Sequence, residues 1–189
     1  MRALSTAWIL PFAFLVASVS SADSTNFRRH ADSRVQLDVN LAWPFPPFRT
    51  WEVKLGFRVG DSTDLVVGYG RQAWTITDIP GINPGTIDSH ALILGARQYV
   101  ARTGAIAEYD AWLAHETFLP PDGRALRGWS LSNEFFGGYV FFLGATHATV
   151  TPGLNAGFWS WKSYGHEQPI DDRYQWTILP KVLGGAAFD

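Results

Sequence analysis

Apolar and polar residues alternate with a period of two over most of the chain. Residues 35–43 are apolar at every second position, and Gln36, Asp38 and Asn40 stand between them. Residues 51–59 repeat this pattern. Such alternation is typical of β-strands whose two faces meet different surroundings. We expect further strands at 64–76, 88–100, 104–117, 129–141, 148–162 and 174–188.

The connections between these segments alternate in length. Those at 60–63, 101–103 and 143–147 are short, whereas the others are longer or rich in proline. Transmembrane barrels combine tight periplasmic turns with longer outer loops, and about 9–11 tilted residues cross the bilayer. The pattern predicts an all-β fold, an antiparallel up-and-down transmembrane β-barrel of about eight strands. The longer connections are expected at 44–49, 77–87, 118–128 and 163–173.

The N-terminus has the pattern of a secretory signal peptide. Arg2 gives a positive start, residues 7–19 form an apolar run, and small residues precede Asp23. The run is shorter than the ~20 residues of a membrane-spanning helix. We therefore expect an N-terminal signal peptide at 1–22, a periplasmic tail at 23–34 and the barrel at 35–189. A retained anchor or a buried helix is the alternative.

Composition narrows the class of protein further. The chain has no cysteine, so disulfides do not stabilise it, and its net charge of −2 argues against nucleic acid as the main partner. It contains nine tryptophans, and 15% of its residues are aromatic. After the N-terminal run there is no second long apolar stretch. Any membrane insertion must therefore use strands, because only helices and closed barrels satisfy their backbone groups in lipid.

Aromatic residues gather near the ends of the expected strands. Membrane barrels carry such rings as girdles at the two interfaces. Packing in the core of a soluble protein is the other interpretation. The predicted girdle consists of Trp43, Trp51, Trp74, Trp129, Trp159, Trp161 and Trp176.

The polar phase of the strands carries charged residues. An eight-stranded barrel is just wide enough for side chains to fill it, and buried charges persist only when they are paired. We therefore predict a buried lumen network, with Arg97 as a further base, and not an ion path. The solvated face of a soluble protein is the alternative. The predicted network is Asp38, Glu52, Lys54, Arg58, Glu108, Asp110 and Glu134.

The signal peptide, the alternating strands from Val35 to Phe188 and the C-terminal segment from Lys181 resemble the small outer-membrane barrels, such as the OmpA transmembrane domain, OmpX and OmpW-like proteins. The resemblance is architectural and covers nearly all of the expected mature chain. It implies the bacterial outer membrane as location, with lipopolysaccharide and the barrel-assembly machinery as partners. These families typically end in an aromatic residue, whereas here Phe188 is followed by Asp189.

Catalytic chemistry has little support. Barrel lipid A deacylases carry His-x-Ser on one strand, where the histidine can take the serine proton. None of the five histidines has serine at +2, and the nearest variant is His115-Glu116-Thr117. We expect His115 to face outward, while Glu116 and Ser130 face the lumen near each other. No catalytic residue, metal site or cofactor is predicted, since zinc sites need several spaced His or Cys ligands.

The sequence therefore favours a non-enzymatic outer-membrane barrel. It would contribute to envelope integrity, present its long loops to a surface ligand, or form a narrow conduit for small apolar molecules. A lipid A-modifying barrel enzyme (acyl hydrolase or transferase) is one alternative. A secreted lipocalin-like binder of a small apolar ligand is the other, and it requires the apolar phase to point inward.

Overall fold

The computed structural model describes residues 32–41, 49–76, 84–100, 103–121, 123–163 and 176–189. The predicted signal peptide, most of the predicted tail and parts of the long loops lie outside these residues. The described chain forms nine strands: β1 Val35–Asn40, β2 Thr50–Gly60, β3 Thr63–Ile76, β4 Gly85–Tyr99, β5 Ala105–Leu119, β6 Leu126–Tyr139, β7 Phe141–Phe142, β8 Ala148–Lys162 and β9 Trp176–Phe188. Among the described residues, no helix is long and apolar enough to cross a membrane.

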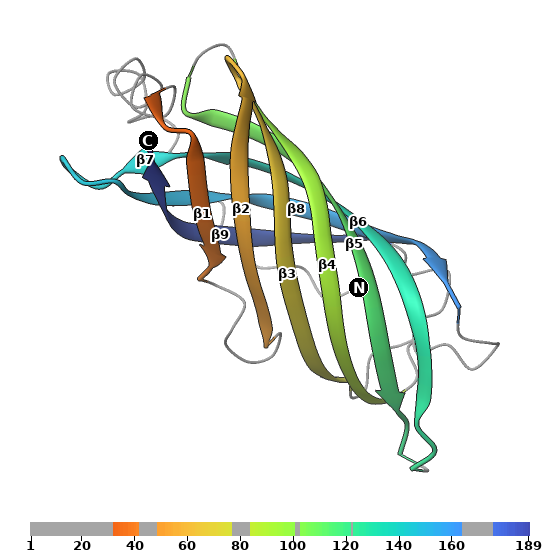
Figure 1. Ribbon diagram of the computed structural model, residues 1–189. Helices are drawn as coiled ribbons and strands as arrows, with labels where there is room; N and C mark the ends of the chain where they lie inside the picture. Colours follow the sequence, from red (N-terminus) through yellow and green to blue (C-terminus); the bar gives the residue numbers. More distant parts are fainter. Residues whose placement is uncertain (1–31, 42–48, 77–83, 101–102, 122, 164–175) are drawn as a thin grey trace.

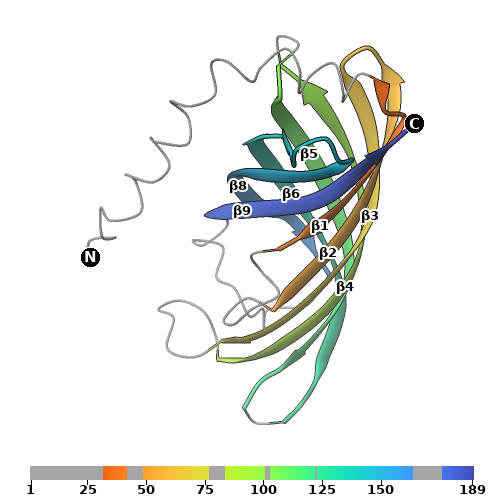
Figure 2. The same cartoon turned by 90° about the vertical axis from the view of Figure 1, so that its left-hand side faces the viewer.

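The strands form one antiparallel sheet that closes on itself (Figures 1 and 2). Its order is β6-β5-β4-β3-β2-β1-β9-β8-β7, and β6 also pairs with β8. The short β7 continues β6, because Gly138↔Gly153 and Phe141↔Val150 belong to the same register. The architecture is therefore an up-and-down barrel with a ring of eight strands, which confirms the predicted fold class.

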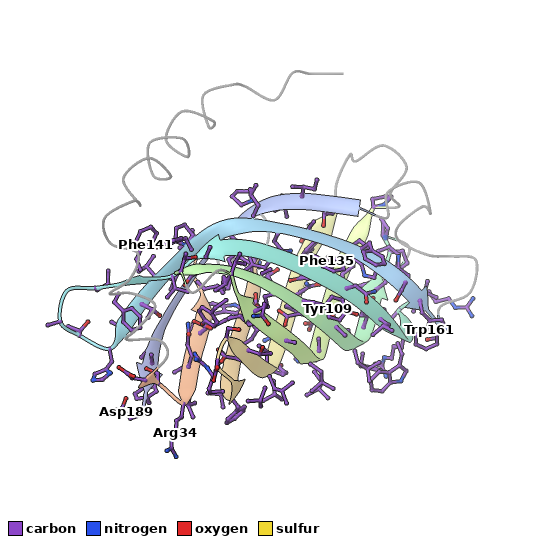
Figure 3. The ribbon with its side chains drawn as sticks, turned by 90° about the horizontal axis from the view of Figure 1, so that it is seen from above. Arg34, Tyr109, Phe135, Phe141, Trp161 and Asp189 are labelled. Atoms are coloured by element: carbon purple, nitrogen blue, oxygen red, sulfur yellow. The ribbon has the colours of Figure 1, made fainter. Side chains whose placement is uncertain are left out.

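The two ends of the barrel differ as the connection lengths predict. Two-residue or slightly longer turns join β2 to β3, β4 to β5 and β7 to β8, while the longer connections lie at the other end. The first and last strands meet beside the short turns, where the Arg34 amide donates to the Phe188 carbonyl at 2.7 Å. Figure 3 places Arg34 and Asp189 at one end of the barrel and Trp161 at the other.

Alternation along each strand produces two chemically different walls. On β2, for example, Glu52 and Lys54 are buried, whereas Val53 and Leu55 between and beyond them are exposed. The buried polar and charged side chains of the ring lie in this inward phase, except for Asn133, which stands in the outward phase of β6 and accepts a hydrogen bond from Tyr109. The large exposed apolar side chains lie mainly in the outward phase.

Three apolar clusters pack inside the barrel and separate its polar parts. One lies near the short turns and contains Tyr99, Ile106, Phe136, Val140 and Leu183. A second surrounds Trp112, and a third joins Ile87 to Phe118 beside the long loops. Charged side chains occupy the middle of the lumen.

Candidate functional site: the polar interior of the barrel

Lys54 on β2 lies at the centre of the charged interior. Its ammonium group is 2.9 Å from Glu52 and 2.8 Å from Asp110, and it also donates to Glu108. The four side chains are almost completely buried, with exposed fractions of 0–2%. Their inward direction follows from the strand period of two, which places alternate residues of β2 and β5 on the same face.

Arg97 on β4 extends this cluster towards β1. Its guanidinium lies 2.7 Å from Asp38 and 2.5 Å from Glu108. Asp38 also accepts a hydrogen bond of 2.8 Å from Gln36. Arg97 was expected as an additional lumen base, and the structure places it there, where it links two carboxylates on different strands.

Lys181 on β9 forms the third cationic centre. It lies 2.8 Å from Glu52 and 3.2 Å from Glu134, and Asn40 also donates to Glu52 at 3.3 Å. Lys181 is not among the residues that the sequence predicted for the network. Its position in the phase opposite to Ile178 and Val182 is the signal that indicates an inward direction.

The three bases contact five acids, and together the eight residues come from six strands of the ring. Of the seven residues predicted to form the lumen network, six lie within this cluster. Arg58 lies apart, because it pairs with Asp64 at 2.7 Å and stacks 5.4 Å from the Tyr99 ring near the short turns. The cluster consists of Asp38, Glu52, Lys54, Arg97, Glu108, Asp110, Glu134 and Lys181.

This arrangement crosslinks the inner wall and occupies the middle of the lumen. Each base contacts at least two carboxylates, so neither sign is buried alone, which is the condition for burying charge. Trp112, with 1% of its surface exposed, packs next to the cluster, and the Lys181 ammonium lies 6.0 Å from the centre of its ring. These contacts are structural, since they pair each base with at least two acids, and they leave the Arg97 Nη1 and Asp110 Oδ1 atoms without a hydrogen-bond partner.

A small cavity of about 40 Å³ lies between the network and the long-loop end. Glu134 and Asn155 contribute to its lining from the middle of the barrel, and polar groups of β3, β6 and β9 complete the wall. Trp74 and Trp159 also line it. The lining residues are Gln72, Trp74, Ser132, Asn133, Glu134, Asn155, Gly157, Phe158, Trp159, Thr177 and Leu179.

Two of the predicted girdle residues therefore belong to the inner wall. Trp74 stands in the inward phase of β3, and its indole N–H donates to Thr50 at 3.1 Å. Trp159 pairs with the inward position of Ser132, one residue before a bulge in β8. Both residues lie near strand ends, as the sequence predicted. However, they occupy inward positions of their strands, so their side chains face the interior at the long-loop end of the barrel.

The outward tryptophans occupy the long-loop end of the wall. Trp51, Trp129 and Trp161 are each about half exposed. Trp43 lies outside the described residues, and so does the side chain of Trp176, although its backbone begins β9. In the described chain, the outward-facing members of the predicted girdle therefore lie on β2, β6 and β8.

The residues that come closest to a catalytic triad lie on opposite sides of the barrel wall. Glu116 faces inward and accepts a hydrogen bond of 2.5 Å from Ser130. His115 faces outward, with its ring 5.2 Å from that of Trp129. Within the described residues, no histidine faces the lumen, since His90 is also on the outer wall and His147 lies in a turn. A serine–histidine–acid triad is not assembled there.

The fold and its interior define a closed up-and-down β-barrel with an apolar outer wall and an ion-paired lumen. No protein-family model matches the sequence, and no curated protein matches it at a significant level. Among solved structures, the chain is similar to the N-terminal β-barrel domain of Pseudomonas aeruginosa OprF. The identity is 14% and the TM-score 0.39, over 80% of this chain and 94% of that domain.

Proposed function

We propose that the chain is a non-enzymatic barrel of the bacterial outer membrane, which anchors its long loops at the cell surface. The observation that carries this proposal is the inverted polarity of the two walls. Soluble monomers rarely expose large continuous apolar patches. Here exposed apolar side chains occur around the ring, on β2, β3, β4, β5, β6, β8 and β9. In hydrocarbon, exposing these apolar side chains costs no free energy of hydration. Closure of the sheet also pairs the backbone N–H and C=O groups of the strands within the membrane.

The occupied lumen favours a scaffold for loops over a conduit. A permanent conduit for small apolar molecules needs an open path with apolar or weakly polar walls. The path along the lumen meets the Trp112 cluster and then three bases held by five acids. Moving these groups aside would break several buried ion pairs, which is expensive.

Two other functions have less support from the geometry. A lipocalin-like binder requires an apolar interior cavity, whereas the central lumen is charged and the apolar phase points outward. A lipid A-modifying enzyme requires a nucleophile and a base that share one side of the wall. His115 and Ser130 lie on opposite sides.

Cell fractionation followed by electrophoresis of unboiled and boiled samples tests the proposal. We expect the protein in the outer-membrane fraction, with a mobility that changes on heating as the barrel unfolds. Recovery of a soluble protein from the periplasm would overturn the membrane assignment. Steady single-channel currents from the purified protein in planar bilayers would show that the lumen is open to ions and would overturn the closed-lumen scaffold.

A further inference from the structure

In the part of the chain that the structure describes, charged and imidazole side chains on the outer wall are confined to one sector. Among the described strand residues that face outward, charged and imidazole groups occur on β3, β4, β5 and β6. The corresponding positions of β1, β2, β8 and β9 are uncharged. All members of the group lie towards the long-loop end of their strands. They are Arg71, Asp88, His90, His115 and Arg127, hereafter the outer basic cluster.

Strand register makes this cluster continuous. Arg71 is the cross-strand partner of His90, which is in turn the partner of His115. Trp51 and Trp129 flank the row, as partners of Arg71 and His115 respectively. Closer to the long loops, Thr117 on β5 stands between Asp88 and Arg127. Directly opposed residues in adjacent strands are near neighbours, so Arg71, His90 and His115 form one row, which Asp88 adjoins through Arg71 and His90. Arg127 stands at the edge of this patch, one strand beyond Thr117.

The side chains of the cluster are positioned but still accessible. The Arg71 guanidinium lies 3.3 Å from Asp88, and the two side chains are 49% and 44% exposed. The His90 Nε2 atom is 3.8 Å from Asp88, and its Nδ1 atom lies 2.5 Å from the Tyr69 hydroxyl. Two arginines oppose one carboxylate here. The cluster therefore has excess positive charge and additional donors in its imidazoles.

The surroundings of the cluster indicate the height at which it meets the membrane. Tryptophan is enriched where hydrocarbon gives way to headgroups, and Trp51 and Trp129 flank the row of Arg71, His90 and His115. Further from the loops, the same strands present apolar residues such as Leu94 and Leu113 to the outside. The basic groups thus lie at the level of lipid headgroups of the outer leaflet.

We propose that the outer basic cluster binds the phosphate group of a phosphorylated outer-leaflet glycolipid. The inference rests on the proposed membrane location. Guanidinium groups bind phosphate through paired, charge-assisted hydrogen bonds, and imidazole N–H groups add further donors. Asp88 holds Arg71 within the patch and, as the single acid, also limits its attraction for anions. The lipid would be held on one side of the barrel, over β3–β6.

Retention of lipid in native mass spectrometry tests the proposal on the full folded protein. The probes are a phosphorylated lipid A-type glycolipid and its dephosphorylated form. We expect the wild-type protein to retain the phosphorylated form more strongly. The double variant Arg71→Gln/Arg127→Gln should weaken that retention on the order of tenfold or more, because each tenfold step corresponds to ~1.4 kcal/mol of lost interaction.

Two further variants separate a specific site from a general effect of charge. Arg34→Gln removes a positive charge at the opposite end of the barrel and should leave retention unchanged. Asp88→Asn should strengthen retention, which a loss of folding would not produce. Equal retention of the two lipids by a correctly inserted barrel overturns this proposal alone. Failure of the protein to enter membranes overturns the proposed function together with it.

Discussion

The inner and outer walls of the barrel are made from the same strands but have opposite chemistry. On β2, Lys54 is 1% exposed, whereas its neighbours Val53 and Leu55 are 43% and 38% exposed. Polar groups that would face water in a soluble sheet pair with one another, and apolar groups that would form a core face outward. Alternation therefore defines two faces, while the surrounding solvent decides which face is turned inward.

Each wall also depends on a different source of stability. The inner wall relies on complementary contacts, in which each base has at least two acidic partners. The outer wall has few such contacts, and under the proposed membrane location its stability depends on the apolar character of the lipid. Substitutions in adjacent positions of one strand should therefore have effects that differ in both size and cause.

The largest effect is expected from Lys54→Met on the inner wall. This substitution leaves Glu52, Glu108 and Asp110 without their shared cation. Breaking a buried pair by removing one partner costs about 3–5 kcal/mol. The midpoint of urea unfolding from lipid vesicles, followed by tryptophan fluorescence, should fall accordingly. Val53→Ala, one position away on the outer wall, provides the matched control and should shift the midpoint much less. Equal shifts would remove the basis for a stabilising network.

A charge placed on the outer wall should cost slightly less. Leu94 is 54% exposed and lies in the middle of an apolar outward face. Leu94→Arg should destabilise the membrane-inserted barrel by about 2–4 kcal/mol, the range for arginine at the centre of a bilayer. The folded fraction after insertion into vesicles measures this loss. Leu94→Met keeps the volume and should have little effect. If the arginine variant inserts as well as wild type, the outer wall does not face hydrocarbon.

Glycines on the two walls provide a third contrast. A Cβ atom at Gly70 would overlap the ring of Trp112 inside the barrel, whereas nothing lies within 4 Å of a Cβ atom at Gly137. Gly70→Ala should cost about 1–3 kcal/mol through overpacking. Gly137→Ala should stay within about 0.5 kcal/mol of wild type. The same unfolding measurement compares them, and a tolerant Gly70 would show that the Trp112 layer is loosely packed.

The smallest effect concerns a polar chain on the outer wall. The Tyr109 hydroxyl donates to Asn133 at 2.7 Å, and Asn133 donates to Ser160 at 2.9 Å. Tyr109 and its neighbour Phe135 are labelled in Figure 3. Tyr109→Phe should cost about 0.5–1.5 kcal/mol. A double-mutant cycle with Asn133→Ala isolates this bond, and a coupling energy of zero would show that it contributes nothing.

The fold class could be predicted from the sequence because each strand is long and strongly alternating. The phase of β2, with Glu52 and Lys54 opposite Val53 and Leu55, is unambiguous in the printed sequence. The alternating lengths of the connections then supplied the topology. Closure of the ring through β6 and β8 follows from pairing that only the structure displays.

Details of the site were less accessible from the sequence. Lys181 follows Pro180 in a strand that also contains small residues, so its alternation is weak. Its partners, the carboxylates of Glu52 and Glu134, lie far away in the sequence. Trp74 and Trp159 were expected among the outward rings because both lie near strand ends. Their strand phase, however, turns both side chains inward. For Trp159, the bulge at the end of β8 further obscured the phase.

Site-directed spin labelling of the outer wall is the most direct test of the membrane barrel. The chain has no cysteine, so a single introduced cysteine gives a unique label. Labels at Leu94, Leu113 and Leu154 are compared in outer-membrane lipid for collision with oxygen, which dissolves in hydrocarbon, and with a water-soluble nickel complex. If the apolar wall faces lipid, all three positions have high oxygen and low nickel accessibility. High nickel accessibility there would show that the apolar wall meets water, and the membrane barrel would be contradicted.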